Sequence, residues 1–320
     1  MLKIFTIATN TFIEVIRQPI YFIVLGCGLF LILLSPYFTL FALMENNKIV
    51  KDMGLATILL TGLFLSAFSS SSVIYQEIEN KTILTIISKP VARWSFILGK
   101  YLGLLFSLFL AQYILSLVFI HIIRTEITEA AYSKSDYPVI LGYLLATIVS
   151  LIMGAFWNFF YQKPFISSAI LSGTMIFSLS FLGLCLIGPK WDLQPFLTNL
   201  DSSVLFASLL IFLATSVLTA FALACSTRLS SFPTMALCIL IFLLGLFSDY
   251  LLGRQADTFF LYRLFYAIIP NLQIYWVIDA ILEERKIPIT YIAFTVIYTL
   301  IFITGILSLA MALFQERETE

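Results

Sequence analysis

Long apolar stretches alternate with short charged segments along most of the chain. A helix needs about 20 mainly apolar residues to cross the hydrocarbon core of a bilayer, and these stretches reach that length. The pattern therefore predicts an all-α polytopic membrane protein with about eight transmembrane helices. We expect these helices at residues 20–43, 55–75, 101–123, 139–160, 165–188, 204–224, 234–252 and 289–314.

Residues 1–18 have a different pattern. Ile4, Ala8, Phe12 and Ile16 recur at helical spacing, and polar residues interrupt the apolar run between them. A secretory signal peptide has an unbroken apolar stretch and a small-residue cleavage site, and neither is present. We therefore expect an amphipathic helix in the membrane interface, which ends where Pro19 begins the first span. The alternative is a frayed start to that span.

The longest connection, at residues 253–288, contains FFLYRLFYAIIPNLQIYWVIDAILEER. It is too apolar for an ordinary loop and too charged for a span. We expect a re-entrant or surface-lying helical pair that is broken at Pro270. No low-complexity segment or linker divides the chain, so residues 1–320 are expected to form one transmembrane domain.

Composition supports the membrane assignment. Hydrophobic residues make up 61% of the chain and charged residues 11%, whereas charged residues make up about 25% of a typical soluble domain. The formal net charge is zero, which argues against nucleic acid as a partner because that partner needs a basic surface. The cysteines lie inside apolar stretches without CxxC spacing, so we expect small packing residues at Cys27, Cys185, Cys225 and Cys238.

Catalytic and cofactor-binding motifs are absent from the sequence. There is no HExxH and no GxSxG, and the lone His121 near the end of the third span is expected to be an interfacial side chain rather than a metal ligand. There is also no GxxxxGK[ST]: Gly99 and Lys100 are followed by Tyr101, and Trp94 stands where the first glycine is needed. We therefore expect no cofactor, no metal and no ATP site in this chain, so any ATP hydrolysis would need another subunit.

Ionisable groups inside a span are costly, and carriers that couple to ions depend on them. Nearly all Asp, Glu, Lys and Arg residues lie outside the expected spans, with Asp249 near the end of the seventh as the exception. We interpret Asp249 as an interfacial carboxylate. The chain thus has no visible proton or sodium relay.

Small residues repeat on one face of the second span. Gly62, Ser66 and Ser70 are spaced by four, and Ser69 begins a run of serines at the end of that span. Such a face allows close approach of helix backbones, or it could line a pathway, and both interpretations stay open. The sixth span has a similar face at Ser216, Ala220 and Ala224.

Residues 77–100 read EIENKTILTIISKPVARWSFILGK and lie between the second and third spans. The apolar residues of 83–87 share one helix face, and Pro90 would end that helix because it lacks an N–H group. Trp94, Phe96 and Ile97 then restart an apolar pattern that continues into the third span. The pattern predicts a short amphipathic helix, a break and a second helix that enters the membrane, with a polar face available to a soluble partner.

The stretch YQEIENKTILTIISKPVARWSFILGKYLG resembles the cytoplasmic segment between the second and third spans of the permeases of type-2, exporter-class ABC transporters. IEVIRQP near the N-terminus resembles the amphipathic elbow helix of that family, ALACSTRLSSFPTMALCILIFLLG its later pair of spans, and LFQERE its end. The residues of the main segment that match the family pattern are Glu77, Glu79, Lys81, Thr82, the run 83–87, Ser88, Lys89, Pro90, Arg93, Gly99 and Lys100.

The resemblance implies a coupling helix that docks into a cleft of a separate ABC ATPase subunit, and a second permease copy, identical or related, beside this one. It implies a bacterial cytoplasmic membrane location, cytoplasmic termini and segment 253–288 on the outer side. Pro90 would set the angle between coupling helix and span, and Arg93 and Lys100 would pair with ATPase carboxylates or with membrane lipids. Many members have six spans, so the pair at 139–188 would be an addition.

Two alternatives belong to other classes. One is a membrane-embedded enzyme on lipid-linked substrates, for which the cluster of Asp279, Glu283, Glu284 and Arg285 would be the catalytic candidate. The other is an ion-coupled secondary carrier, which the missing intramembrane charges disfavour. The sequence does not identify a cargo.

Overall fold

The structure, a computed structural model, describes residues 2–38, 46–79, 92–132, 136–196, 201–253, 260–283, 285 and 287–317. Almost all of these residues are α-helical, which confirms the predicted all-α polytopic fold. The helices are α1 (Leu2–Ile16), α2 (Pro19–Phe38), α3 (Asn46–Glu79), α5 (Arg93–Tyr132), α6 (Tyr137–Tyr161), α7 (Phe165–Leu186), α8 (Ser202–Ser226), α9 (Ser231–Leu246), α10 (Ser248–Leu251), α11 (Phe260–Ile268), α12 (Ile278–Leu282) and α13 (Ile289–Arg317), with a 3-10 helix η3 at Gln273–Tyr275.

Seven helices of the described ranges are long and apolar enough to cross a membrane: α2, α3, α5, α6, α7, α8 and α13. Each coincides with an expected span. The expected span at 234–252 is different, because α9 has 16 residues and ends at Leu246. Sixteen residues rise only about 24 Å, less than the roughly 30 Å of the hydrocarbon core. An eighth crossing exists only if the bent pair Tyr262–Ile268 and Gln273–Leu282, with 46° between its parts, is one span.

A long-range contact explains why α9 stops early. The carbonyl oxygen of Gly245 accepts a hydrogen bond from the backbone N–H of Leu272 at 3.0 Å and another from the hydroxyl of Ser248. A Cβ on Gly245 would lie 2.8 Å from the carbonyl oxygen of Pro270. The break around Pro270 therefore packs directly on the end of α9, and the Gly245 carbonyl bonds there instead of continuing the helix.

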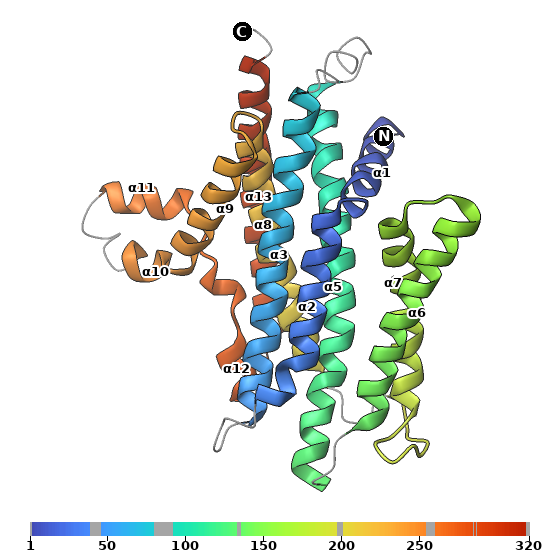
Figure 1. Ribbon diagram of the computed structural model, residues 1–320. Helices are drawn as coiled ribbons and strands as arrows, with labels where there is room; N and C mark the ends of the chain where they lie inside the picture. The colour runs from blue at the N-terminus through green and yellow to red at the C-terminus, as the bar shows by residue number, and fades with distance from the viewer. Residues whose placement is uncertain are drawn as a thin grey trace.

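The helices run between two ends of an elongated bundle (Figure 1). The start of α1, the last turn of α3, the first turn of α5 and the end of α13 lie at the same end, at the top of Figure 1, which we call the termini end. The pair α6–α7 lies on one side of the bundle, and α9, α10 and α11 lie on the other. Thus α1 begins, and α13 ends, at the termini end of the bundle.

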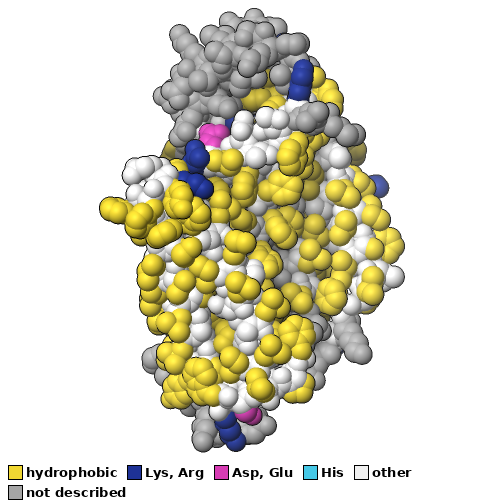
Figure 2. All heavy atoms as spheres, turned by 90° about the vertical axis from the view of Figure 1, so that its right-hand side faces the viewer, with side chains coloured by type: hydrophobic (Ala, Val, Ile, Leu, Met, Phe, Trp, Pro, Cys, Tyr) yellow, Lys and Arg dark blue, Asp and Glu magenta, His cyan; other side chains and the backbone are white. Residues whose placement is uncertain are grey.

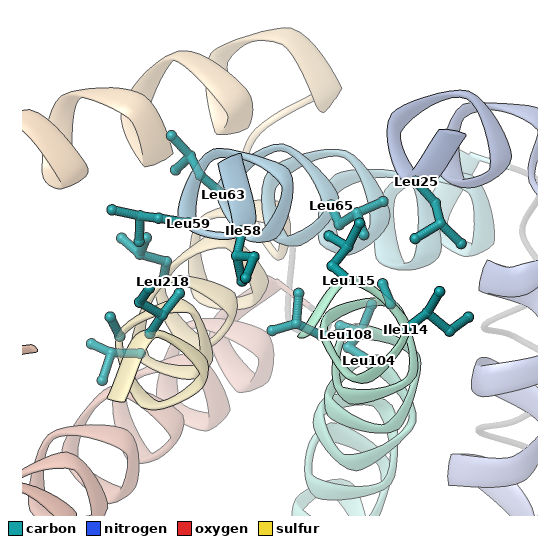
Figure 3. Close-up of a cluster of buried hydrophobic side chains, with 14 of the residues drawn as sticks. Leu25, Ile58, Leu59, Leu63, Leu65, Leu104, Leu108, Ile114, Leu115 and Leu218 are labelled. Carbon is teal, nitrogen blue, oxygen red and sulfur yellow. The ribbon is translucent and has the colours of Figure 1, made fainter. Parts of the chain in front are cut away.

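The core of the bundle is built from α3, α5 and α8 with α2 beside them. Figure 3 shows leucine and isoleucine side chains of these helices directed toward one another, among them Leu59 of α3, Leu108 of α5 and Leu218 of α8, all of them buried. Lipid tails are as apolar as leucine, so the hydrophobic effect does not drive helices together inside a bilayer. Close packing and hydrogen bonds between helices must supply that stability, and both occur in this core.

The face formed by α6 and α7 has the surface of a membrane protein. Hydrophobic side chains cover the middle of this face, while Lys and Arg side chains lie toward its two ends (Figure 2). Large apolar side chains point outward on both helices, such as Phe159, Met175 and Leu179. A bilayer around the middle of the bundle would cover this surface, and the protein is accordingly a multi-pass membrane protein.

Candidate functional site

The structure describes only part of the segment 77–100 that the sequence singled out. Glu77 and Glu79 belong to the last turn of α3, and Arg93 begins α5 with an exposed side chain. The ends of the segment therefore lie at the termini end of two long core helices (Figure 1). The positions that lie outside the described residues are Lys81, Thr82, Ser88, Lys89 and Pro90, together with the expected helix at 83–87.

Helix α1 packs on the first turns of α5 at backbone distance. A Cβ on Gly99 would lie 2.8 Å from the side chain of Ile7, and a Cβ on Gly103 would lie 2.5 Å from the carbonyl oxygen of Ala8. Ala8 and Val15 are buried on the same face of α1. The expected N-terminal amphipathic helix is present, and its apolar face packs on α5. Gly99 thus acts in helix packing, because no side chain larger than hydrogen has room there.

Lys100 is directed into the protein. Its side chain is buried, its Nζ lies 3.5 Å from Oε2 of Glu14 on α1, and it also lies 5.8 Å from the centre of the Phe96 ring. The expectation that Lys100 pairs with a carboxylate of another protein or with a lipid therefore differs from the structure, where a carboxylate of the same chain is its neighbour. No pattern in the sequence indicated Glu14 in this role.

A hydrogen bond joins the α1–α2 turn to α3. The side-chain amide of Gln18 donates to the hydroxyl of Ser72 at 2.8 Å. Together with the contacts of Gly99, Gly103 and Lys100, this bond connects α1 to both helices that flank residues 80–91. We call the set of Glu14, Gln18, Ser72, Gly99 and Lys100 the elbow contact.

The small-residue face of α3 is buried between helices. A Cβ on Gly62 would lie 2.6 Å from Cγ2 of Thr215 on α8 and would also meet the side chain of Gln112 on α5. Gln112 itself donates a hydrogen bond to the Thr215 hydroxyl at 3.0 Å. Ser66, Ser69 and Ser70 are each less than 5% exposed. The sequence left open whether this face packs against other helices or lines a pathway. Within one chain, the face packs against α5 and α8.

A buried ion pair connects α5, α6 and α7 at the other end of the bundle. Arg124 Nε donates to Oδ2 of Asp136 at 3.0 Å, and Arg124 Nη1 donates to the carbonyl oxygen of Leu184 at 2.8 Å. Arg124 and Asp136 are almost completely buried. Burial raises the pKa of Asp136, and the charge and hydrogen bond of Arg124 oppose that rise. No pattern in the sequence indicated this pair.

His121 lies beside that pair and is fully buried, so its assignment as an interfacial side chain was wrong. Its Nδ1 lies 2.7 Å from the hydroxyl of Tyr143, and its Nε2 lies 3.7 Å from the sulfur of Cys185. The Tyr143 hydroxyl donates to the Leu117 carbonyl oxygen. Within the described ranges, no three His, Cys, Asp or Glu side chains are placed to hold a metal ion.

The acidic cluster considered for an enzyme lies on the surface. Glu283 and Arg285 form an ion pair of 2.7 Å with both side chains mostly exposed, and Asp279 lies on α12. Glu284 lies outside the described residues. Asp249, on α10, accepts a hydrogen bond from the Tyr266 hydroxyl at 3.3 Å.

Comparisons of the chain with models of known protein families, with curated proteins and with solved structures found no match. The geometry of this multi-pass helical membrane protein and its segment at residues 77–100 are therefore the evidence for its function.

Proposed function

We propose that the chain is the membrane-spanning permease subunit of an ATP-driven ABC transporter of the exporter class. A separate ATPase subunit binds and hydrolyses ATP, and residues 77–100 transmit its movement to the membrane helices. A second permease, identical or related, completes the complex. The protein lies in the bacterial cytoplasmic membrane with the termini end in the cytoplasm.

The observation that carries this proposal is the elbow contact at the exit of the segment. α1 packs on the first turns of α5 at backbone distance, at Gly99 and Gly103, and Lys100 pairs with Glu14. A segment that only connects two spans needs no such support. A segment that receives force does need it, because force is transmitted only through elements that cannot shift independently.

The lengths of the two flanking helices support the same role. α3 has 34 residues and α5 has 40, which correspond to about 51 Å and about 60 Å. Both exceed the roughly 30 Å hydrocarbon core, so they extend beyond it as continuous helices. A displacement applied near Glu79 and Arg93 would therefore reach the core contacts of α3, α5 and α8 directly.

In this mechanism the ATPase subunits close on ATP binding and move the coupling segment as a rigid body. Lys89 and the exposed Arg93 offer charges for the carboxylates of the ATPase. The tilt of α3 and α5 then changes the space between the two permeases, through which the cargo moves. With the termini end in the cytoplasm, only the later part of the aromatic segment after Gly253, at α12, would lie at the outer end of that route (Figure 1).

The test is co-purification with an ABC-type ATPase encoded beside this chain and co-expressed with it. The triple variant Glu79→Ala, Lys89→Ala, Arg93→Ala is expected to lose the ATPase. The matched control removes charges from elsewhere on the surface, by Lys190→Ala, Glu283→Ala and Arg285→Ala, and is expected to retain it. Thermal unfolding of both variants checks that they fold.

Two results would overturn the proposal. One is unchanged ATPase association and transport in the coupling triple variant; the other is chemical labelling that places Lys89 on the outer membrane face. Transport by the purified chain without any ATPase would instead support an ion-coupled carrier. Loss of activity on substitution of Glu283 or Asp279 alone, with no ATPase present, would support the membrane-embedded enzyme.

A further inference from the structure

An open groove of about 700 Å³ lies between α8, α9, α11 and α13, on the side of the bundle away from α6 and α7 (Figure 1). Its described lining is almost wholly apolar, with Phe221 of α8, Ile241 of α9, Ile268 of α11 and Leu309 of α13 among its residues. Ile268 and Leu309 each expose more than half of their surface. The groove faces the bilayer and is large enough for a flexible apolar chain.

A cationic side chain lies at one limit of this groove. Arg228 follows the end of α8, at the termini end, and it is the one charged residue among the described lining residues. Lining residues that precede the ends of α8 and α13, such as Phe221 and Gly305, lie deeper along these helices and are apolar or lack a side chain. The groove thus presents a positive charge close to one membrane surface and apolar side chains at greater depth, which is the polarity of a lipid in one leaflet.

We propose that this groove binds an anionic phospholipid from the leaflet at the termini end, with an acyl chain along α8 and α13 and the headgroup phosphate at Arg228. The guanidinium group suits this role because it donates two parallel hydrogen bonds to phosphate oxygens. Because Arg228 is positively charged, the site should favour an anionic headgroup. The inference is independent of the ATPase, because it uses no residue of the elbow contact or of segment 77–100.

A second groove in the same chain serves as an internal comparison. It measures about 480 Å³ and lies between α1, α5 and α7, with Phe5, Phe12, Phe109 and Tyr113 in its lining. No charged residue occurs among its described lining residues. Any lipid chain that enters this second groove should show no preference for headgroup charge, so such a preference can be assigned to the groove at Arg228.

Gly305 provides a way to fill the proposed site. It lies in the lining on α13, and a Cβ added to it would meet no atom within 4 Å. Gly305→Phe therefore adds a large side chain to the groove from a position whose Cβ meets no neighbour. Gly183 on α7 also has no atom within 4 Å of an added Cβ, and it lines neither groove. Gly183→Phe is the matched control, with the same added side chain on another open helix surface.

The experiment is native mass spectrometry of the full chain in detergent, titrated with dioleoyl phosphatidylglycerol or dioleoyl phosphatidylcholine. The wild type is expected to prefer phosphatidylglycerol about fivefold, the effect of one basic residue near an anionic headgroup. Arg228→Gln is expected to remove this preference and to leave weak binding of both lipids. Gly305→Phe is expected to lower the occupancy of both lipids, and Gly183→Phe is expected to match the wild type.

Equal affinity of the wild type for the two lipids would overturn the anionic part of the proposal. Wild-type occupancy in Gly305→Phe would overturn the location. Since Arg228→Gln tests the site without adding volume, a poorly folded Gly305→Phe would still leave the headgroup preference as a decisive measurement. Failure here would leave ATPase association unaffected, and failure of the ATPase test would leave the lipid titration unaffected.

Discussion

Gly103 of α5 lies against the backbone of Ala8 in α1, so close that a Cβ on the glycine would be 2.5 Å from the Ala8 carbonyl oxygen. One turn earlier, a Cβ on Gly99 would be 3.1 Å from the carbonyl oxygen of Ile4. Both neighbours are backbone atoms, which cannot rotate out of the way. The two glycines therefore fix the distance between α1 and α5.

Gly103→Ala is expected to destabilise the protein, because the added methyl group forces α1 away from α5. Overpacking of this kind costs about 1–3 kcal/mol. Thermal unfolding in detergent measures the effect. Gly26→Ala on α2 is the control, since a Cβ there meets no atom within 4 Å, and it should leave the melting temperature unchanged or raise it slightly. Equal melting temperatures of the Gly103→Ala variant and the wild type would contradict the described packing.

Removal of one partner of the Arg124–Asp136 pair is expected to be strongly destabilising. Asp136→Asn leaves a buried arginine without its counter-charge, at a cost of about 3–5 kcal/mol. The exposed pair of Glu283 and Arg285 is the control: Glu283→Gln should change stability by less than about 1 kcal/mol. Chemical or thermal unfolding of the purified variants distinguishes the two costs.

Replacement of both partners of the buried pair is expected to be less harmful than replacement of one. Arg124→Leu with Asp136→Leu removes both charges, so no isolated charge remains buried. The double variant should therefore melt above Asp136→Asn. A double variant that is less stable than Asp136→Asn would mean that the hydrogen bond from Arg124 to the Leu184 carbonyl, rather than the ion pair, is the important interaction.

Asp201 should make stability depend on pH. Burial raises its pKa, but the hydrogen bond and charge of Lys51 at 2.8 Å, with the N–H of Ser203, more than compensate and hold the pKa below its ordinary value. A lowered pKa in the folded state means that Asp201 stabilises the protein above the unfolded-state pKa of about 3.9 and that this stabilisation is lost as pH falls through the folded-state pKa.

Asp201→Asn tests this dependence because asparagine still caps the start of α8 while it removes the charge. The wild type should be the more stable protein near neutral pH, and the difference should diminish below about pH 4. Unfolding temperatures of both proteins across this pH range provide the measurement. A difference that is constant across the range would show that the charge of Asp201 contributes nothing.

Ser70→Ala is expected to stabilise the protein slightly. The Ser70 side chain is fully buried on α3, and its hydroxyl has no hydrogen-bond partner among the described atoms. A buried polar group in that state costs about 1–3 kcal/mol, so its removal should raise the melting temperature and leave transport unchanged. If Ser70 instead lines a pathway, Ser70→Ala would reduce transport without raising stability. Ser66→Ala is the comparison, because the Ser66 hydroxyl does donate to the Leu63 carbonyl oxygen.

The sequence predicted the long spans well because the length of an apolar run is a local property. It misplaced the end of the seventh span for a reason that is not local. The apolar residues continue to Leu252, but the Gly245 carbonyl oxygen bonds to the N–H of Leu272, and that contact ends α9. The length of an apolar run indicates which residues a bilayer can cover. It does not indicate whether the helix formed by these residues is continuous.

The candidate site shows the same limit. Gly99 and Lys100 were predicted to belong to a segment that couples to an ATPase. Their neighbours Ile7 and Glu14 come from the first helix, and no pattern within residues 77–100 indicates that contact. The pair of Arg124 and Asp136 was likewise not predicted, because Asp136 lies beyond the end of α5. The pattern of residues within one segment does not show which residues, distant in sequence, pack against it.

Helix α5 forms one ion pair near each of its ends. Lys100 pairs with Glu14, and Arg124, about 36 Å further along the same unbroken helix, pairs with Asp136. The first ion pair connects α5 to the N-terminal helix α1, and the second connects it to the hairpin of α6 and α7. A rotation of α5 would therefore move α1 and this hairpin at the same time. Elements at both membrane surfaces would then move together rather than one after the other.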